Sequence, residues 1–208
     1  MTRAIGGSLL LLAGGLGSRM WGKNKLYLEL GGAPLLGQIL TRLSPLFDET
    51  LLLAAKGGAR EARERLGPLL NRWNVRITED RAEGRGPLEG LCRGLAAMNG
   101  EWGLLLGCDM PFADEAVLRG MAALRAEETD VVTAEIGGWL EPLHAFYSSR
   151  CLPRAEAALA QGGRIKAFYR ESRLTILNEE ALSRLSPGYK KSFTNLNTPG
   201  DLSMIMRS

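Results

Sequence analysis

A glycine-rich loop follows the first apolar run of the chain. It reads LAGGLGSRMWGKNK from Leu12 to Lys25. Its glycines let main-chain N–H groups come close to an anion, and Arg19 and Lys25 are placed to offset the charge of phosphate oxygens. The spacing differs from the Walker pattern GxxxxGK[ST], and no acidic residue is placed for a dinucleotide fingerprint. The glycines alone therefore leave two readings open, a triphosphate site and a structural turn.

Asp109 is the strongest candidate metal ligand. It ends the apolar run in WGLLLGCDMPF, which places its carboxylate at the carboxyl end of an expected buried strand, where α/β proteins bind ligands. Mg²⁺ takes one or two carboxylates together with substrate phosphates. The alternative is a turn or helix-capping role before Pro111. Cys108 beside it is expected to be a small buried hydrophobe and not a nucleophile.

A second segment that can carry chemistry reads TEDRAEGRGPLEGL. Asp80 is expected to contact base, ribose or metal, and a solvated loop carboxylate is its alternative. Gly86 and Gly90 allow a second substrate to approach the backbone, although tight helix packing explains glycine equally well. His144, the single histidine, is expected to be structural, because phosphoryl transfer depends mainly on positioning and charge stabilisation.

Short apolar runs alternate with segments of helical periodicity, which predicts a three-layer α/β/α domain with a Rossmann-like, mostly parallel sheet. A helix is expected from about Pro87, and another behind the capping residue Asp114, with a stripe that ends at Leu124. A short helix is expected from Thr198. We expect one domain over residues 1–208. The expected strands are 8–12, 51–55, 75–78, 103–106 and 130–134.

Composition excludes several classes of protein. The chain is 45% hydrophobic and 24% charged, as is usual for soluble globular proteins. Its net charge of +3 comes from dispersed residues, so nucleic acid is not an expected partner. Three cysteines without CxxC spacing argue against a disulfide framework and a zinc site and favour the reducing cytoplasm. The first apolar run is too short to cross a membrane, and no export signal is visible.

Five motifs in order resemble the molybdenum cofactor guanylyltransferase (MobA) family. They are LAGGLGSRMWGKNK, GPLEGL, CDMPF, EPLHAFY and NLNTPGDL, and they extend from residue 12 to residue 202. Members of that family transfer GMP from magnesium GTP to the terminal phosphate of molybdopterin, or of its molybdenum-loaded form, and release pyrophosphate. The resemblance implies the same substrates and Mg²⁺ here, with cofactor-biosynthesis or acceptor proteins as possible partners and neither nucleic acid nor membrane.

The resemblance also assigns residue roles. Asp80 would help place the guanosine, Asp109 would hold nucleotide and magnesium, and Arg19 would stabilise phosphate charge. The residues expected to contact GTP are Leu12, Ala13, Gly14, Gly15 and Lys25. Those expected near the pterin substrate or the reacting phosphates are Gly86, Pro87, Leu88, Gly90, Arg164, Asn195 and Asn197.

Three positions depart from the family pattern. Trp21 replaces a common glycine, Asn24 stands where an Asp is usual, and Ala55 falls where many members place an Asn that helps to read the nucleotide. Two rival functions therefore remain open. One is a cytidylyltransferase acting on molybdopterin or on another small phosphorylated substrate, such as an isoprenoid precursor. The other is a nucleotide-binding regulator without catalysis.

Overall fold

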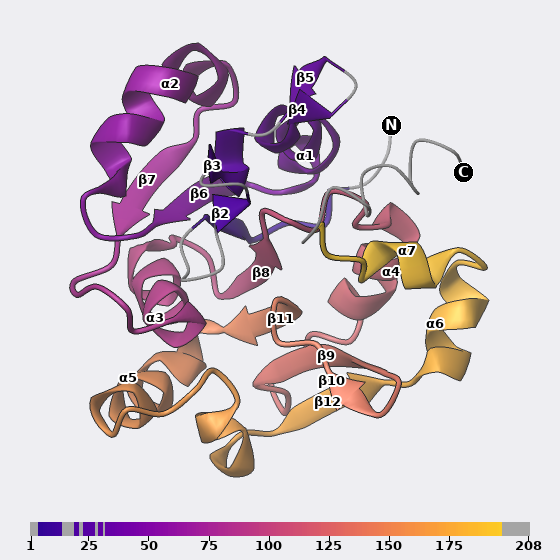
Figure 1. The fold of residues 1–208 in the computed structure, drawn as a ribbon. Coiled ribbons are helices and arrows are strands. Elements are labelled where there is room, and N and C mark those ends of the chain that lie inside the picture. The colour runs from indigo at the N-terminus through magenta and orange to yellow at the C-terminus, as the bar shows by residue number, and fades with distance from the viewer. Residues whose placement is uncertain (1–3, 14–18, 21–22, 28, 31, 197–208) are drawn as a thin grey trace.

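The structure is a computed structural model that describes residues 4–13, 19–20, 23–27, 29–30 and 32–196, with the main chain alone at 19–20, 23–25 and 30. Eight strands form one sheet in the order β10-β9-β11-β8-β1-β6-β7, and β12 also pairs with β9 (Figure 1). These strands are β1 (Ser8–Leu12), β6 (Glu49–Ala54), β7 (Arg76–Glu79), β8 (Trp102–Gly107), β9 (Val131–Ile136), β10 (Trp139–Leu140), β11 (His144–Ser148) and β12 (Leu174–Leu177). Two small hairpins pair β2 (Arg19–Met20) with β3 (Lys23–Asn24), and β4 (Glu29–Leu30) with β5 (Ala33–Pro34).

The centre of the sheet is built from continuous apolar strands. β1 lies between β6 and β8 and is parallel to both, so that Leu10 is in register with Leu51 and Leu105. Leu9, Leu10 and Leu11 are 0% exposed. A strand that is covered on both faces needs no alternation of polar and apolar residues, which is why this sequence reads as one apolar run.

Helices cover both faces of the sheet, as the sequence predicts. Leu9 and Leu11 share one apolar cluster with α1, α2, α4 and α6, whereas Leu10 belongs to a second cluster with α3 and α5. The three-layer α/β/α prediction is confirmed. The α-helices are α1 (Leu35–Leu43), α2 (Gly58–Arg72), α3 (Pro87–Ala97), α4 (Glu115–Ala122), α5 (Leu152–Ala160), α6 (Glu179–Leu185) and α7 (Tyr189–Ser192). The 3₁₀ turns are η1 (Lys25–Tyr27), η2 (Ser44–Leu46), η3 (Ser149–Cys151) and η4 (Ala167–Glu171).

The predicted elements agree with the structure to within a residue or two, with two differences. The stripe behind Asp114 is shorter than expected, because α4 ends at Ala122 and Leu124 is 40% exposed. The sheet is mostly parallel, as predicted, but the sequence did not predict β11, which runs antiparallel between β8 and β9. The helix predicted from Thr198 lies outside the described residues, and the single domain over 1–208 stays a prediction. Among the described residues, no helix is long and apolar enough to cross a membrane.

The buried carboxylate of Asp130 links the neighbouring strands β9 and β12. Asp130 is 2% exposed and receives hydrogen bonds from Arg173 through the main-chain N–H (3.0 Å), Nε (3.2 Å) and Nη2 (2.9 Å). Arg154 Nη2 lies 3.0 Å from its Oδ2. The hydrogen bonds from Arg173 lower the pKa of Asp130 to about 2. Because Arg173 directly precedes β12, this cluster joins β12 to the start of β9.

Candidate nucleotide-binding site

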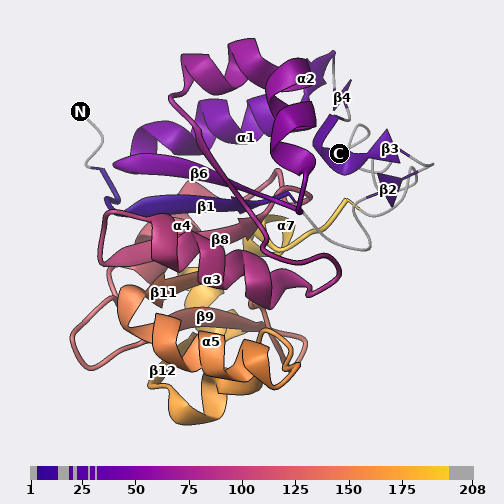
Figure 2. The same ribbon diagram turned by 90° about the vertical axis from the view of Figure 1, so that its left-hand side faces the viewer.

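The carboxyl ends of β1, β6, β7 and β8 meet at one edge of the sheet, because these neighbours are all parallel. Hydrogen bonds continue past the strand ends: Ala13 N donates to Leu53 O (2.9 Å), Asp80 N to Ala54 O (3.0 Å) and Cys108 N to Leu12 O (3.1 Å). In Figure 2, β2 and β3 lie at the end toward which β1 points. The structure therefore brings the predicted residues Leu12, Ala13, Asp80 and Asp109 to a common edge.

Asp109 lies in a tight turn directly after β8. Met110 N donates to Gly107 O (3.0 Å), which closes the turn, while Gly107 N donates to Leu143 O (3.1 Å). The carboxylate folds back over Gly107, since a Cβ added to that glycine would lie 2.5 Å from Asp109 Oδ1. The turn expected as an alternative is present, and it directs the half-buried carboxylate over the end of its own strand.

Two distant segments hold the chain around Asp109. Leu196 N donates to Asp109 O (2.8 Å), which places the exposed Asn195 next to the turn. Arg42, on α1, donates from Nη1 to Pro111 O (2.6 Å) and from Nη2 to Ala113 O (2.7 Å). Sequence reasoning missed Arg42, because nothing local marks an arginine whose partners lie some seventy residues away.

Asp80 differs from an ordinary solvated loop carboxylate. It is half-buried just after β7, and burial, followed by the negative charge of Glu89, raises its pKa to about 6. Arg93 opposes this shift and Glu79 adds to it. A carboxylate with a raised pKa at the ligand edge of an α/β sheet is typical of a functional group.

The glycines of GPLEGL have two different physical roles. Gly86 caps α3 with a φ of +71°, and a Cβ there would meet nothing within 4 Å, so the turn itself requires glycine. A Cβ on Gly90 would lie 2.4 Å from Leu12 Cδ1, so this glycine lets α3 pack against the end of β1. Pro87 occupies the first turn of α3, as predicted. Leu88 is 1% exposed, so contact with a substrate would have to come from its main chain.

Comparison with known proteins identifies the family. Residues 9–176 match the model of the MobA-like NTP transferase domain. The chain belongs to this family. It is 31% identical over 194 residues to a molybdenum cofactor guanylyltransferase of Desulfosudis oleivorans, covering 93% of this chain and 91% of that protein. It is 30% identical over 196 residues to a molybdenum cofactor guanylyltransferase of Pseudomonas putida, with 92% and 93% covered.

Solved structures agree with this MobA-like assignment. The molybdopterin-guanine dinucleotide biosynthesis protein A of Archaeoglobus fulgidus is 25% identical, with a TM-score of 0.76 and 95% of each chain covered. The 4-diphosphocytidyl-2C-methyl-D-erythritol synthase of Anaerococcus prevotii is 17% identical, with a TM-score of 0.68 and 97% and 96% covered. The second likeness concerns the fold alone.

Part of the expected MobA-like site falls on residues that the structure places by main chain only or leaves undescribed. Arg19 pairs with Asn24 across the β2–β3 hairpin, and Lys25 begins η1 directly afterwards, so the main chains of Arg19 and Lys25 lie close together. Gly14, Gly15, Trp21 and Asn197 lie outside the described residues.

Arg164 is exposed in the connection between α5 and η4. Two residues further along this connection, Lys166 Nζ lies 5.8 Å from the ring centroid of Trp139, on β10. The Arg164 segment therefore meets the β9–β10 hairpin, three strands away from β8 in the sheet order. Its place near the reacting groups stays a prediction.

His144 and Cys108 are buried parts of the MobA-like core. His144 packs on Phe193 with ring centroids 4.4 Å apart, and burial lowers its pKa to about 4. It is therefore neutral at physiological pH and has no access to solvent. Burial also raises the pKa of the Cys108 thiol, which opposes formation of a nucleophilic thiolate. Both observations agree with the structural roles predicted for these residues.

The donor set at the carboxyl edge fits magnesium. Among the described residues, no group of three or more His, Cys, Asp and Glu side chains could hold a metal ion. Mg²⁺ does not need such a group, because it takes one or two carboxylates and completes its shell with phosphates and water. Asp109 beside a bound triphosphate meets that requirement.

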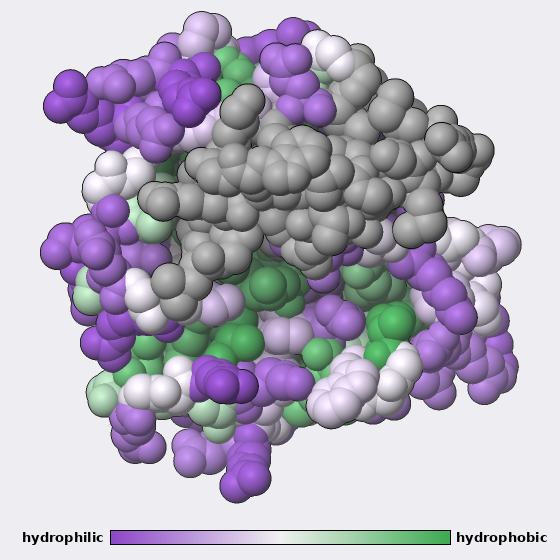
Figure 3. All heavy atoms as spheres, viewed as in Figure 1, coloured by the Kyte–Doolittle hydropathy of each residue, from purple (hydrophilic) through white to green (hydrophobic). Residues whose placement is uncertain are grey.

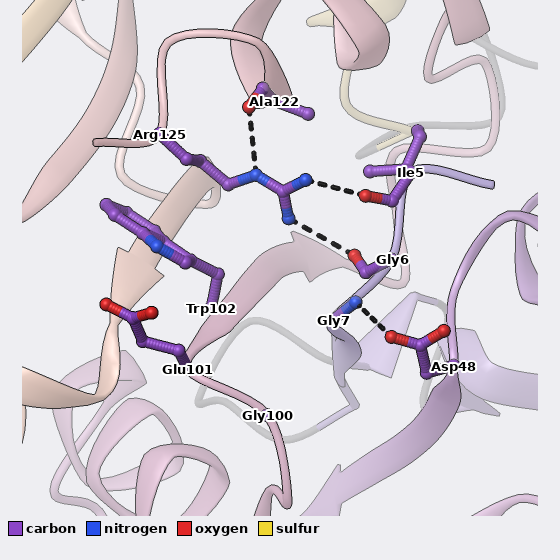
Figure 4. Close-up of a pocket in the computed structure, with 9 residues that line it drawn as sticks. All are labelled: Ile5, Gly6, Gly7, Asp48, Gly100, Glu101, Trp102, Ala122 and Arg125. Carbon is purple, nitrogen blue, oxygen red and sulfur yellow. Dashed lines mark hydrogen bonds between the residues drawn. The ribbon is translucent and has the colours of Figure 1, made fainter. Parts of the chain in front are cut away.

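A pocket of about 390 Å³ lies at the opposite edge of the sheet, around the start of β1 (Figure 4). Arg125 donates there to Ala122 O (2.9 Å), Gly6 O (3.2 Å) and Ile5 O (2.6 Å). Asp48 accepts from Gly7 N (2.6 Å). These groups fix the entry of the chain into the sheet, so we assign the pocket a structural role.

Proposed function

We propose that this protein transfers GMP from magnesium GTP to the terminal phosphate of molybdopterin, or of its molybdenum-loaded form. The products are the guanine dinucleotide cofactor and pyrophosphate. One observation carries the proposal: Leu12 and Ala13, Asp80 and Asp109 converge at the carboxyl edge of the sheet in a MobA-like chain. Relatives that are about 30% identical over nearly the whole chain bear the name molybdenum cofactor guanylyltransferase.

The family resemblance supports the roles that we propose for the nucleotide-binding residues. Main-chain N–H groups of the loop that includes Gly14 and Gly15 bind phosphate oxygens, and Asp80 accepts hydrogen bonds from the guanosine. The main chains of Arg19 and Lys25 lie close together at the small hairpin, and their cationic groups offset the charge that gathers on the reacting α-phosphate.

The reaction is an in-line displacement at the α-phosphorus by an oxygen of the molybdopterin phosphate. The bond to the pyrophosphate leaving group breaks, and no covalent enzyme intermediate forms. Asp109 is the residue that would hold Mg²⁺, and a bound Mg²⁺ supplies charge stabilisation to the triphosphate. Asp109 itself is held in place by the turn over Gly107 and by Leu196 N.

The second substrate is proposed to lie along α3 and toward the C-terminal segment. Gly86 and Pro87 offer a partly exposed backbone without bulky side chains, and Asn195 stands beside the Asp109 turn. Gly90 is buried and contributes by letting α3 pack closely against the end of β1. Figure 3 has the same view as Figure 1. It shows hydrophobic residues at the surface in the area where Figure 1 labels β11 and β9, with hydrophilic residues around them. An apolar surface beside a few polar groups is suited to a flat heteroaromatic ring. The remaining contacts, from Arg164 and Asn197, belong to the same proposal.

Replacing Asp109 tests the site. Asp109→Ala should abolish pyrophosphate release from magnesium GTP and molybdopterin while the unfolding transition stays cooperative, because the carboxylate lies in an edge turn. Asp48→Ala at the opposite sheet edge is the control, since it removes a carboxylate that binds Gly7 N and should leave turnover intact. Turnover of Asp109→Ala close to that of the wild type would disprove the assignment.

Ala55 gives a specific reason to test CTP as well. It is exposed immediately after β6, at the same edge as Asp80, and presents only a methyl group. If an amide at this position reads guanine in other members, one contact with the base is absent here. Transfer of CMP in preference to GMP would support the cytidylyltransferase alternative, and absence of any transfer would support the regulator.

A cytoplasmic location and partner proteins of cofactor biosynthesis are further parts of the proposal.

A further inference from the structure

Glu89 is a buried carboxylate beside the loop that carries Asp80. It occupies the first turn of α3, with only 3% of its surface exposed. Arg85 Nε lies 3.9 Å from its Oε2. The helix N-terminus favours a negative charge at this position, but an exposed side chain would benefit in the same way without the cost of burial.

The buried carboxylate binds the loop that carries Asp80. Glu89 Oε1 accepts a hydrogen bond from Arg81 N (2.9 Å), the main-chain group directly after Asp80. A Glu in the first turn commonly reaches back to the N–H of the capping residue, whereas this one reaches across to a residue eight positions earlier. The hydrogen bond fixes the peptide that follows Asp80.

Other contacts fasten the rest of the same loop. Arg85 Nη2 donates to Leu159 O (2.5 Å), and Arg93 Nε donates to Glu79 O (3.0 Å). A pocket of about 320 Å³ between this loop, α3 and α5 is lined by Arg81, Arg85, Glu89, Arg93 and Glu156, among others. Within this polar cluster, Glu89 is the carboxylate that holds the main chain next to Asp80.

The charge of Glu89 also acts on Asp80. The described charged groups that act on Asp80 are Glu79 on β7, and Glu89 and Arg93 on α3. Glu89 has the largest effect of the three and raises the pKa of Asp80, in addition to the effect of burial. A more basic carboxylate is a stronger hydrogen-bond acceptor while it remains ionised.

We infer that Glu89 is a positioning residue for nucleotide binding, which fixes the orientation of Asp80 through Arg81 N and keeps its carboxylate a strong acceptor. The inference rests on the proposed function, because it takes Asp80 to contact the guanosine. With 3% of its surface exposed, Glu89 acts through Arg81 N and Asp80 and not through its own contact with the nucleotide.

Equilibrium binding of magnesium GTP at about pH 5 to 8 tests this inference without a transfer assay. Glu89→Ala removes both the acceptor and the charge, whereas Glu89→Gln keeps the acceptor oxygen and removes only the charge. Glu156→Gln is the matched control, because Glu156 lines the same pocket but lies 4.0 Å from the side chain of Arg81.

Glu89→Ala should weaken binding by about tenfold at pH 8, the effect of one lost hydrogen bond. Glu89→Gln should restore most of the binding at pH 8, because it keeps an acceptor oxygen for Arg81 N. It should also shift the acid loss of binding, which we expect near the Asp80 pKa of about 6 in the wild type, to lower pH. The midpoint would stay unchanged if the charge of Glu89 did not act on the carboxylate that controls binding.

Three results would overturn the inference. Glu89→Ala could bind as the wild type does; Glu89→Gln could keep the wild-type midpoint; or Glu156→Gln could reproduce the effect of Glu89→Gln. If Glu89→Ala does not fold, the midpoint of Glu89→Gln decides. Failure of the wild-type protein to bind magnesium GTP at any pH would instead refute the proposed function, and the inference would fall with it.

Discussion

A methyl group added at Gly107 should damage the metal site and leave the fold intact. The new Cβ would lie 2.5 Å from Asp109 Oδ1, whereas ordinary contacts begin at 3.4 Å, so the carboxylate oxygen must move by about 0.9 Å. The φ of Gly107 is not in the left-handed region, so alanine fits the backbone. A misplacement of about 1 Å can cost on the order of 100-fold in rate, or about 2.7 kcal/mol. We therefore expect kcat/KM of Gly107→Ala to fall by about 100-fold.

Gly103→Ala, in the same strand, is the matched control. Its Cβ would meet Leu10 Cδ1 at 2.7 Å and Met98 Sδ at 3.0 Å, far from the carboxylate. Overpacking of this kind costs about 1–3 kcal/mol of stability, whereas the stability of Gly107→Ala should stay within about 1 kcal/mol of the wild type. Pyrophosphate release and urea denaturation of both variants measure the two effects. Wild-type kcat/KM in Gly107→Ala, or an equal loss of activity in both variants, would refute the reasoning.

Three further changes follow from buried titratable groups. Asp80→Asn should raise KM for GTP by about tenfold. It should also raise the stability of the fold above pH 6. The pKa of Asp80 is raised to about 6, so the wild type loses stability as pH rises from about 4 through that value. Asp130→Asn should lower stability at neutral pH by about 2 kcal/mol, the effect of weakened hydrogen bonds to a charged group. Since the pKa of Asp130 is lowered to about 2, the wild-type advantage should decline as pH falls from about 4 toward 2. His144→Leu should keep wild-type turnover. It should also remove a loss of stability expected of the wild type as pH falls from about 6.5, the ordinary pKa of histidine, to about 4, the lowered pKa of His144. Thermal or urea unfolding at several pH values measures each change, and loss of turnover in His144→Leu would show that the histidine takes part in the reaction.

Local sequence signals predicted the central sheet and the edge at which the site lies. The apolar run before Asp109 and the proline at the start of α3 act over a few residues, so their consequences can be read without knowledge of the fold. The strand β11 was missed, because its five residues follow the motif EPL without a clear alternation and their pairing with β8 is tertiary. The contacts of Arg42 and Glu89 were missed for the same reason, since their partners are main-chain groups that only the fold brings near.

The proposed identity of the nucleotide is tested most directly by incorporation of label from each α-labelled nucleoside triphosphate into molybdopterin, with magnesium present. The guanylyltransferase proposal predicts that GTP gives a labelled dinucleotide and an equal amount of pyrophosphate, and that Asp109→Ala gives neither. Preferential incorporation from CTP, or no incorporation from any of the four, would contradict it.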